Sequence, residues 1–181
     1  MKNIYNFIIE KLILNKDTKI IKYKYFPKTK EDLREIIKER LKKDKNAGLN
    51  DIDVSNITDM SFLFNGLDPH NIDISQWDVS NVTNMSNMFW LCENFNSNLK
   101  DWDVSNVRVM TLMFCNCKNF NSDLGRWDVS NVKNMRSMFW DCNKFDSNIS
   151  DWNVSNVEDM RSMFWKCDSM KKLPEWYFKR K

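Results

Sequence analysis

Residues 77–101 read WDVSNVTNMSNMFWLCENFNSNLKD, and this stretch decides the fold because it recurs along the chain. The next copy begins 25 residues later at Trp102, and two more begin at Trp127 and Trp152. A degenerate copy precedes them and begins at Ile52. A fixed period of roughly 20–50 residues indicates a repeat architecture, in which neighbouring units stack and share one core.

Two apolar patterns alternate within each repeat. Met85, Phe89 and Cys92 recur at the spacing of one face of a helix. Residues 99–104 read LKDWDV, and this L-x-x-W-x-V pattern matches the strand segment of leucine-rich repeats. We therefore predict an α/β fold, a leucine-rich-repeat-like solenoid of 25-residue strand-turn-helix repeats.

The flanking residues predict specialised ends. Residues 1–49 form an N-terminal α+β capping segment, with a helix over residues 1–11, a strand over 19–26 and a helix over 30–43 for which Thr29 is a favourable N-cap. The solenoid covers residues 50–169. Residues 170–181 repeat the apolar pattern with a shift, contain Pro174 and end in a basic tail, which predicts a C-terminal cap.

Charge is distributed unevenly along the chain and limits the kinds of partner. Residues 1–48 hold 14 basic against 7 acidic residues, residues 49–165 hold 8 against 16, and residues 166–181 hold 6 against 2. An acidic body of this length repels a phosphate backbone, so we expect no nucleic-acid partner. No stretch approaches the roughly 18 apolar residues needed to cross a bilayer, so we expect no membrane span.

The repeated motif W-D-V-S-N-V-x-x-M-x-x-M-F-x-x-C-x-x-F-N resembles the BspA-like leucine-rich-repeat surface proteins, a bacterial 26-residue-repeat lipoprotein family of unknown function. The resemblance extends over residues 50–170 and implies a solenoid displayed on bacterial surfaces for adhesion or self-association, with no catalytic residues to transfer. The N-terminus lacks the pattern of a secretion signal and a lipobox cysteine. The compartment therefore stays unknown, with the bacterial surface and the cytoplasm both open.

Cysteine and histidine give little support for metal or catalytic chemistry. Cys92 heads a column of four cysteines at the repeat spacing, and a metal or disulfide role competes there with packing in the core. We favour core packing, because no histidine column completes a metal set. Cys115 is an odd fifth thiol, which argues against a disulfide framework. The one histidine, His70, has no partner at any motif spacing, so we expect neither metal, cofactor nor catalytic site.

Two outward-facing columns are candidates for binding a partner. The first is an acidic stripe on the predicted strands, expected to receive a basic partner or a divalent cation; alternatively, Asp78, Asp103 and Asp128 accept backbone N–H bonds in the turns. The second is a tryptophan column one residue after the core Phe, where a partner interface competes with packing between neighbouring repeats. The candidate residues are Asp78, Asp101, Asp103, Arg126, Asp128, Asp151, Trp90, Trp140 and Trp165.

These observations favour a non-enzymatic protein-interaction or adhesion module that uses the exposed face of the repeats, with an unidentified protein as its partner. The alternative from a different class is a structural protein that assembles with itself through the tryptophan column and its charged ends. An enzyme with an unrecognised site is a third reading, and it would require a deep polar pocket with convergent ionisable groups.

Overall fold

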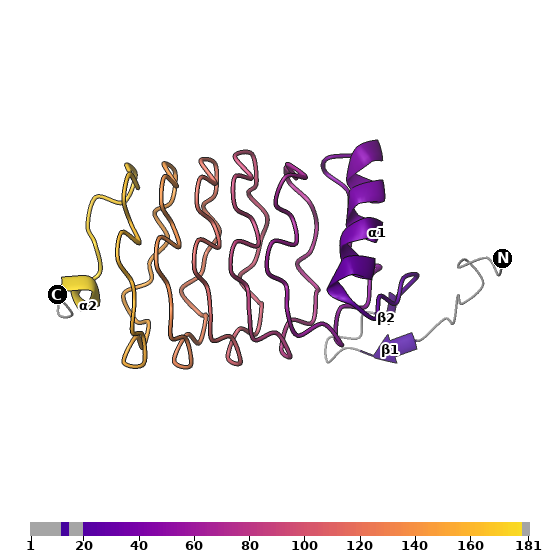
Figure 1. Cartoon of the computed structure of the whole chain (residues 1–181), viewed down its shortest axis with the longest axis horizontal. Coiled ribbons are helices and arrows are strands. Elements are labelled where there is room, and N and C mark those ends of the chain that lie inside the picture. The colour runs from indigo at the N-terminus through magenta and orange to yellow at the C-terminus, as the bar shows by residue number, and fades with distance from the viewer. Residues whose placement is uncertain (1–11, 15–19, 179–181) are drawn as a thin grey trace.

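The computed structural model describes residues 12–14 and 20–178 (Figure 1). Two short strands, β1 (Leu12–Leu14) and β2 (Ile20–Lys22), pair antiparallel near the N-terminus. Two helices follow, α1 (Lys30–Lys43) before the repeats and α2 (Glu175–Phe178) after them. The helix expected over residues 1–11 lies outside the described residues, and the division of the chain into cap, repeats and tail stays a prediction.

Between α1 and α2, each 25-residue repeat makes one irregular turn of chain, called a coil below, and the coils lie side by side along the long axis (Figure 1). Parallel single-residue bridges join them at the repeat spacing, from Asp59 to Asn84, Val109, Asn134 and Asp159 in succession. The apolar columns of Trp, Val, Met, Phe and Cys lie in one continuous core. Stacking therefore buries residues that a single repeat would leave exposed.

The predicted α/β solenoid of strand-turn-helix repeats is wrong. Within the described residues, the coils between α1 and α2 contain neither a helix nor an extended strand, and only isolated bridges connect them. The backbone explains why Met85–Cys92 is not helical, since Asn87 and Leu91 have left-handed φ angles of 57° and 64° that interrupt any right-handed helix. Gly66 occupies the position equivalent to Leu91 in the degenerate repeat, with φ of 73°.

Tight turns produce the spacing that resembles a helix. The N–H groups of Met88 and Cys92 donate to the carbonyls three residues earlier, those of Met85 and Phe89. Met85, Met88, Phe89 and Cys92 are all fully buried. A succession of turns thus directs the same side chains inward as a helical face would, although the backbone is different.

Alternate residues of this segment bond to the next coil instead. The N–H groups of Met85, Asn87, Phe89 and Leu91 donate to carbonyls 24 residues further on, at 2.9 Å in each case, and the acceptors are Val109, Thr111, Met113 and Cys115. We call this arrangement the donor row. The arrangement recurs from coil to coil. The peptide group between Asn84 and Met85, for example, accepts a hydrogen bond from the preceding coil through the Asn84 carbonyl and donates one to the following coil through the Met85 N–H.

Aromatic columns run through the core parallel to the stack. The rings of Phe64, Phe89, Phe114 and Phe139 stack with successive centroid distances of 5.0, 5.6 and 5.7 Å. Each core Trp donates its indole N–H to a carbonyl of the preceding coil, as Trp102 does to Ile74 at 3.0 Å. Buried indole groups therefore have partners, as their polarity requires.

Helix α1 covers the N-terminal end of the stack with its buried face of Leu33, Ile37 and Leu41. It occupies the residues predicted from the sequence, and Thr29 forms a capping box with Asp32. The predicted strand over residues 19–26 is realised in part, as β2.

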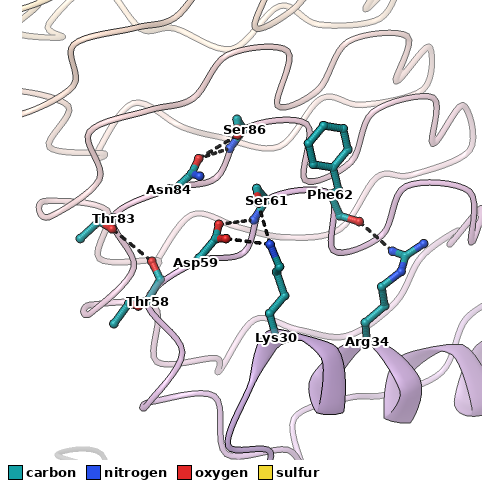
Figure 2. A network of polar contacts seen from close by, with 9 residues as sticks. All are labelled: Lys30, Arg34, Thr58, Asp59, Ser61, Phe62, Thr83, Asn84 and Ser86. Atoms are coloured by element: carbon teal, nitrogen blue, oxygen red, sulfur yellow. Dashed lines mark hydrogen bonds and ion pairs between the residues drawn. The ribbon is translucent and has the colours of Figure 1, made fainter.

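Polar side chains of α1 complete the contact with the first coil, as Figure 2 shows. Lys30 donates to Asp59 Oδ2 at 2.7 Å and to Ser61 Oγ at 3.0 Å. Arg34 donates to the carbonyls of Phe62, at 2.7 Å, and of Leu63. It also donates to the carbonyl of Asn65 at 2.6 Å. Arg34 therefore caps the carbonyl end of the stack.

Candidate functional site

The cysteine column lies in the core. All five thiols are free and buried. Cys117, Cys142 and Cys167 donate their S–H groups to Phe carbonyls of the preceding coil at 3.0, 2.9 and 2.9 Å. Burial raises the pKa of the Cys92 and Cys167 thiols to about 12. The column therefore acts as packing, and its sulfurs stay protonated at neutral pH. Among the described residues, no three His, Cys, Asp or Glu side chains gather to hold a metal ion.

The candidate acidic stripe is exposed but is not uniformly acidic. A shallow groove of about 240 Å³ brings together Asp101, Asp103, Arg126 and Asp128, together with Lys100. Asp78 and Asp151 are exposed and lie outside this groove. Basic side chains between the carboxylates weaken the field that would attract a cation or a basic partner.

The aspartates of the repeated Asp-Val-Ser segment are engaged by their own turns, which is the alternative that the sequence left open. Oδ1 of Asp78, Asp103 and Asp128 accepts the backbone N–H two residues further on, at 3.1, 3.0 and 3.0 Å. Hydrogen bonds from Ser130 lower the pKa of Asp128. These carboxylates stabilise turns, and they are left with reduced capacity for a ligand.

An ion pair in the last coil predicts acid sensitivity. Asp159 Oδ2 lies 2.8 Å from Arg161 Nη2, and hydrogen bonds from the Arg161 side chain and backbone lower the pKa of Asp159 to about 2. The folded pKa lies below the ordinary value of 3.8, so this contribution to stability is present at neutral pH and is lost as the pH falls from about 4 to 2. In Asp159→Asn, we expect the urea midpoint to fall less over this interval than in the wild type.

Asparagine is a matched replacement at this position. Asn84 and Asn134 occupy the equivalent sites and accept the same backbone N–H bond, each at 3.0 Å. Asp159→Asn thus removes the titrating carboxylate and keeps the turn. Equal slopes of urea midpoint against pH in the two proteins would contradict the assignment.

Exposed or half-buried aromatic side chains lie on the segment that carries the donor row in four of the five coils. Trp165 is 56% exposed and its ring lies 5.7 Å from the half-buried Trp140. Trp90, also half-buried, packs edge-on against Phe62 at 6.5 Å. We name this surface the apolar edge, and its members are Phe62, Trp90, Leu91, Trp140 and Trp165. The buried Cys115 interrupts it in the third coil.

Sequence reasoning missed two members of the apolar edge. Phe62 is 45% exposed and Leu91 49%, although both stand in a segment where neighbouring apolar residues are buried. Their left-handed backbone directs them outward. Periodicity offered little signal for them, because the equivalent residues in most other repeats are polar, such as Asn116 and Ser137.

Asparagines line a second groove that the sequence analysis did not identify. This open groove of about 690 Å³ runs across several coils, and His70 lies in it. The amide oxygens of Asn96 and Asn121 each accept a backbone N–H of the next coil, both at 2.9 Å. These amides therefore join neighbouring coils. Within the described part of the chain, the ionic neighbour of His70 is Asp68, at 3.5 Å.

Comparison with known proteins identifies a family without an assigned function. No helix among the described residues is long and apolar enough to cross a lipid bilayer. No curated protein and no solved structure was found to match. A family model described as "Mycoplasma protein of unknown function, DUF285" matches residues 31–125 and again residues 101–180. Because these matches together span most of the chain, the protein belongs to the DUF285 family.

Proposed function

We propose that the chain is a non-enzymatic binding module for another protein, which it contacts through the apolar edge. The observation that supports this proposal is the neighbouring pair of Trp140 and Trp165 on the surface, with Trp165 more than half exposed. Tryptophan is enriched among the residues that dominate binding energy at protein interfaces. The resemblance to the BspA-like surface proteins would make adhesion one form of such binding.

The apolar edge is a better candidate for binding a partner than the acidic stripe, because three carboxylates of the stripe already have hydrogen-bond partners. Asp103 and Asp128 are engaged in their turns, as described above. The apolar edge, in contrast, exposes large side chains on a backbone held in place by hydrogen bonds between coils. A rigid surface loses little conformational entropy when it binds, so its apolar contacts contribute more fully to affinity.

Removal of the tryptophan pair tests the proposal. Trp140→Ser combined with Trp165→Ser is expected to weaken capture of protein partners from an extract of the source cells by at least roughly tenfold, because each interface Trp commonly contributes about 2 kcal/mol or more. The measurement is quantitative recovery on immobilised chain. Arg126→Ala, an exposed residue of the other groove, is the control and should leave recovery unchanged.

Two results would contradict the proposal. One is equal recovery by the wild type and the double variant, with both shown to be folded by urea unfolding. The other is light scattering that shows the wild type assembling with itself as its concentration rises, because self-assembly through the edge is the competing function.

A further inference from the structure

The donor row reaches an open end at the last coil. In the coil before it, the N–H groups of alternate residues donate to the last coil at 2.8, 3.0, 3.0 and 2.7 Å. The donors are Met135, Ser137, Phe139 and Asp141, and the acceptors are the carbonyls of Asp159, Arg161, Met163 and Trp165. The equivalent N–H groups of the last coil belong to Met160, Ser162, Phe164 and Lys166, and no acceptor for them exists among the described residues.

Part of this end is covered and part is open. The ring of Phe164 packs against Tyr177 at 5.1 Å, and Phe164 is buried. Ser162 and Lys166, in contrast, are exposed, whereas the equivalent Ser137 of the preceding coil is buried. We call the N–H groups of Met160, Ser162 and Lys166 the open donor row.

The surroundings of the open donor row favour a ligand that is both an acceptor and acidic. Unpaired N–H groups at the end of aligned peptide units carry partial positive charge. The exposed Lys166, Lys171 and Lys172 add full positive charges nearby in the chain, and residues 166–181 hold 6 basic against 2 acidic residues, Asp168 and Glu175. On the preceding side of the row, Glu158 and Asp159 are paired with Lys133 and Arg161. Trp165 beside the row offers an exposed apolar contact.

A second copy of the chain does not meet these requirements. The carbonyl end of the same ladder, in the first coil, is covered by α1 and partly occupied by Arg34, which donates to the ladder carbonyls of Leu63 and Asn65. α1 itself carries net positive charge, with 6 basic against 4 acidic residues. Stacking the two ends would bring α1 against the last coil and place like charges together.

We infer that the open donor row binds an acidic segment of another polypeptide, whose alternate backbone carbonyls continue the ladder as one further coil segment. The mode is analogous to the addition of a peptide strand to a sheet edge, where backbone hydrogen bonds provide affinity and side chains provide selectivity. The inference goes beyond the proposed function, because it concerns the end of the stack and backbone groups instead of the apolar edge.

Amide hydrogen exchange of the whole chain, followed by NMR, tests the inference. In the free protein, the amides of Ser162 and Lys166 should exchange far faster than the paired amides of Ser137 and Asp141. The probe is a synthetic peptide copied from residues 157–170 with Arg161→Glu and Lys166→Glu. It should slow exchange at Ser162 and Lys166 by at least roughly tenfold, without change at Ser137, because each new backbone hydrogen bond must open before exchange occurs.

Charge and site are controlled separately. A control peptide with the natural sequence of residues 157–170, changed only by Glu158→Lys and Asp168→Lys, is basic and should bind more weakly. Lys171→Glu with Lys172→Glu in the protein should weaken binding of the acidic peptide by roughly threefold or more, because two attractive exposed charges become repulsive. Trp90→Ser, which alters the apolar edge at the other end of the stack, next to Phe62, should leave this binding unchanged, so failure here is distinguishable from failure of the proposed function.

Three results would overturn the inference. The first is slow exchange of Ser162 and Lys166 in the free monomer, which would show that the row is already paired. The second is protection that rises with protein concentration in the absence of peptide, which would assign the row to a second copy. The third is equal protection by the acidic and basic peptides, or none by either.

Discussion

Phe114→Ala is expected to lower the free energy of unfolding by about 3–5 kcal/mol, the range observed when a fully buried Phe is truncated. Phe114 lies at the centre of the Phe column, with ring centroids 5.6 Å from Phe89, 5.7 Å from Phe139 and 4.1 Å from Phe120. Its removal leaves a cavity between the second and fourth coils. Equilibrium urea unfolding followed by Trp fluorescence measures the loss.

The position of the cavity predicts a second effect. Coils of a repeat protein contact mainly their neighbours, so a defect in the middle weakens the coupling between the two halves of the stack. We expect a broader unfolding transition in Phe114→Ala than in the wild type, with the C-terminal coils unfolding separately.

Phe62→Ala is the matched control for Phe114→Ala. Phe62 is 45% exposed, and its contact with Arg34 involves the backbone carbonyl, which the substitution keeps. We expect a loss of less than about 1 kcal/mol, in the range of surface substitutions. Phe114→Leu, which fills most of the space, provides an intermediate if Phe114→Ala does not fold. Similar losses for Phe62→Ala and Phe114→Ala would contradict the continuous core.

Arg34→Ala is expected to lower the free energy of unfolding by about 1.5–3 kcal/mol, the range for hydrogen bonds to a charged donor. Arg34 donates to three carbonyls of the first coil, those of Phe62, Leu63 and Asn65, and the last two lie at the end of the ladder. Hydrogen exchange of the α1 amides should report the loss directly, because α1 loses part of its attachment to the first coil.

Two further substitutions in α1 serve as controls for Arg34→Ala. Arg34→Lys keeps the charge and lacks the planar fork of donors, so it should recover only part of the stability. Glu35→Ala, on the exposed side of the same helix, should change stability by less than about 0.5 kcal/mol. Equal stability of Arg34→Ala and Glu35→Ala would refute the capping role of Arg34.

The apolar edge illustrates how far sequence reasoning reaches in the site. The position of Trp90, Trp140 and Trp165 directly after the core Phe predicts that they face outward. In the structure Trp165 is exposed, whereas Trp90 and Trp140 are half-buried. The acidic stripe was also placed at the surface, where the turns engage Asp78, Asp103 and Asp128. Phe62 and Leu91 escaped detection, because residue type alone would have placed them in the core.

The sequence by itself determined the 25-residue period, the columns of side chains that share the core, and the bounds of α1 with its Thr29 cap. Each of these depends on local spacing or on residue type, which the sequence contains directly. The tertiary structure alone decided the backbone of the repeats. Spacing of buried residues does not distinguish a helix from a succession of tight turns. The left-handed residues Asn87 and Leu91 are stabilised by carbonyls 24 residues away, and those acceptors exist only once neighbouring coils have stacked.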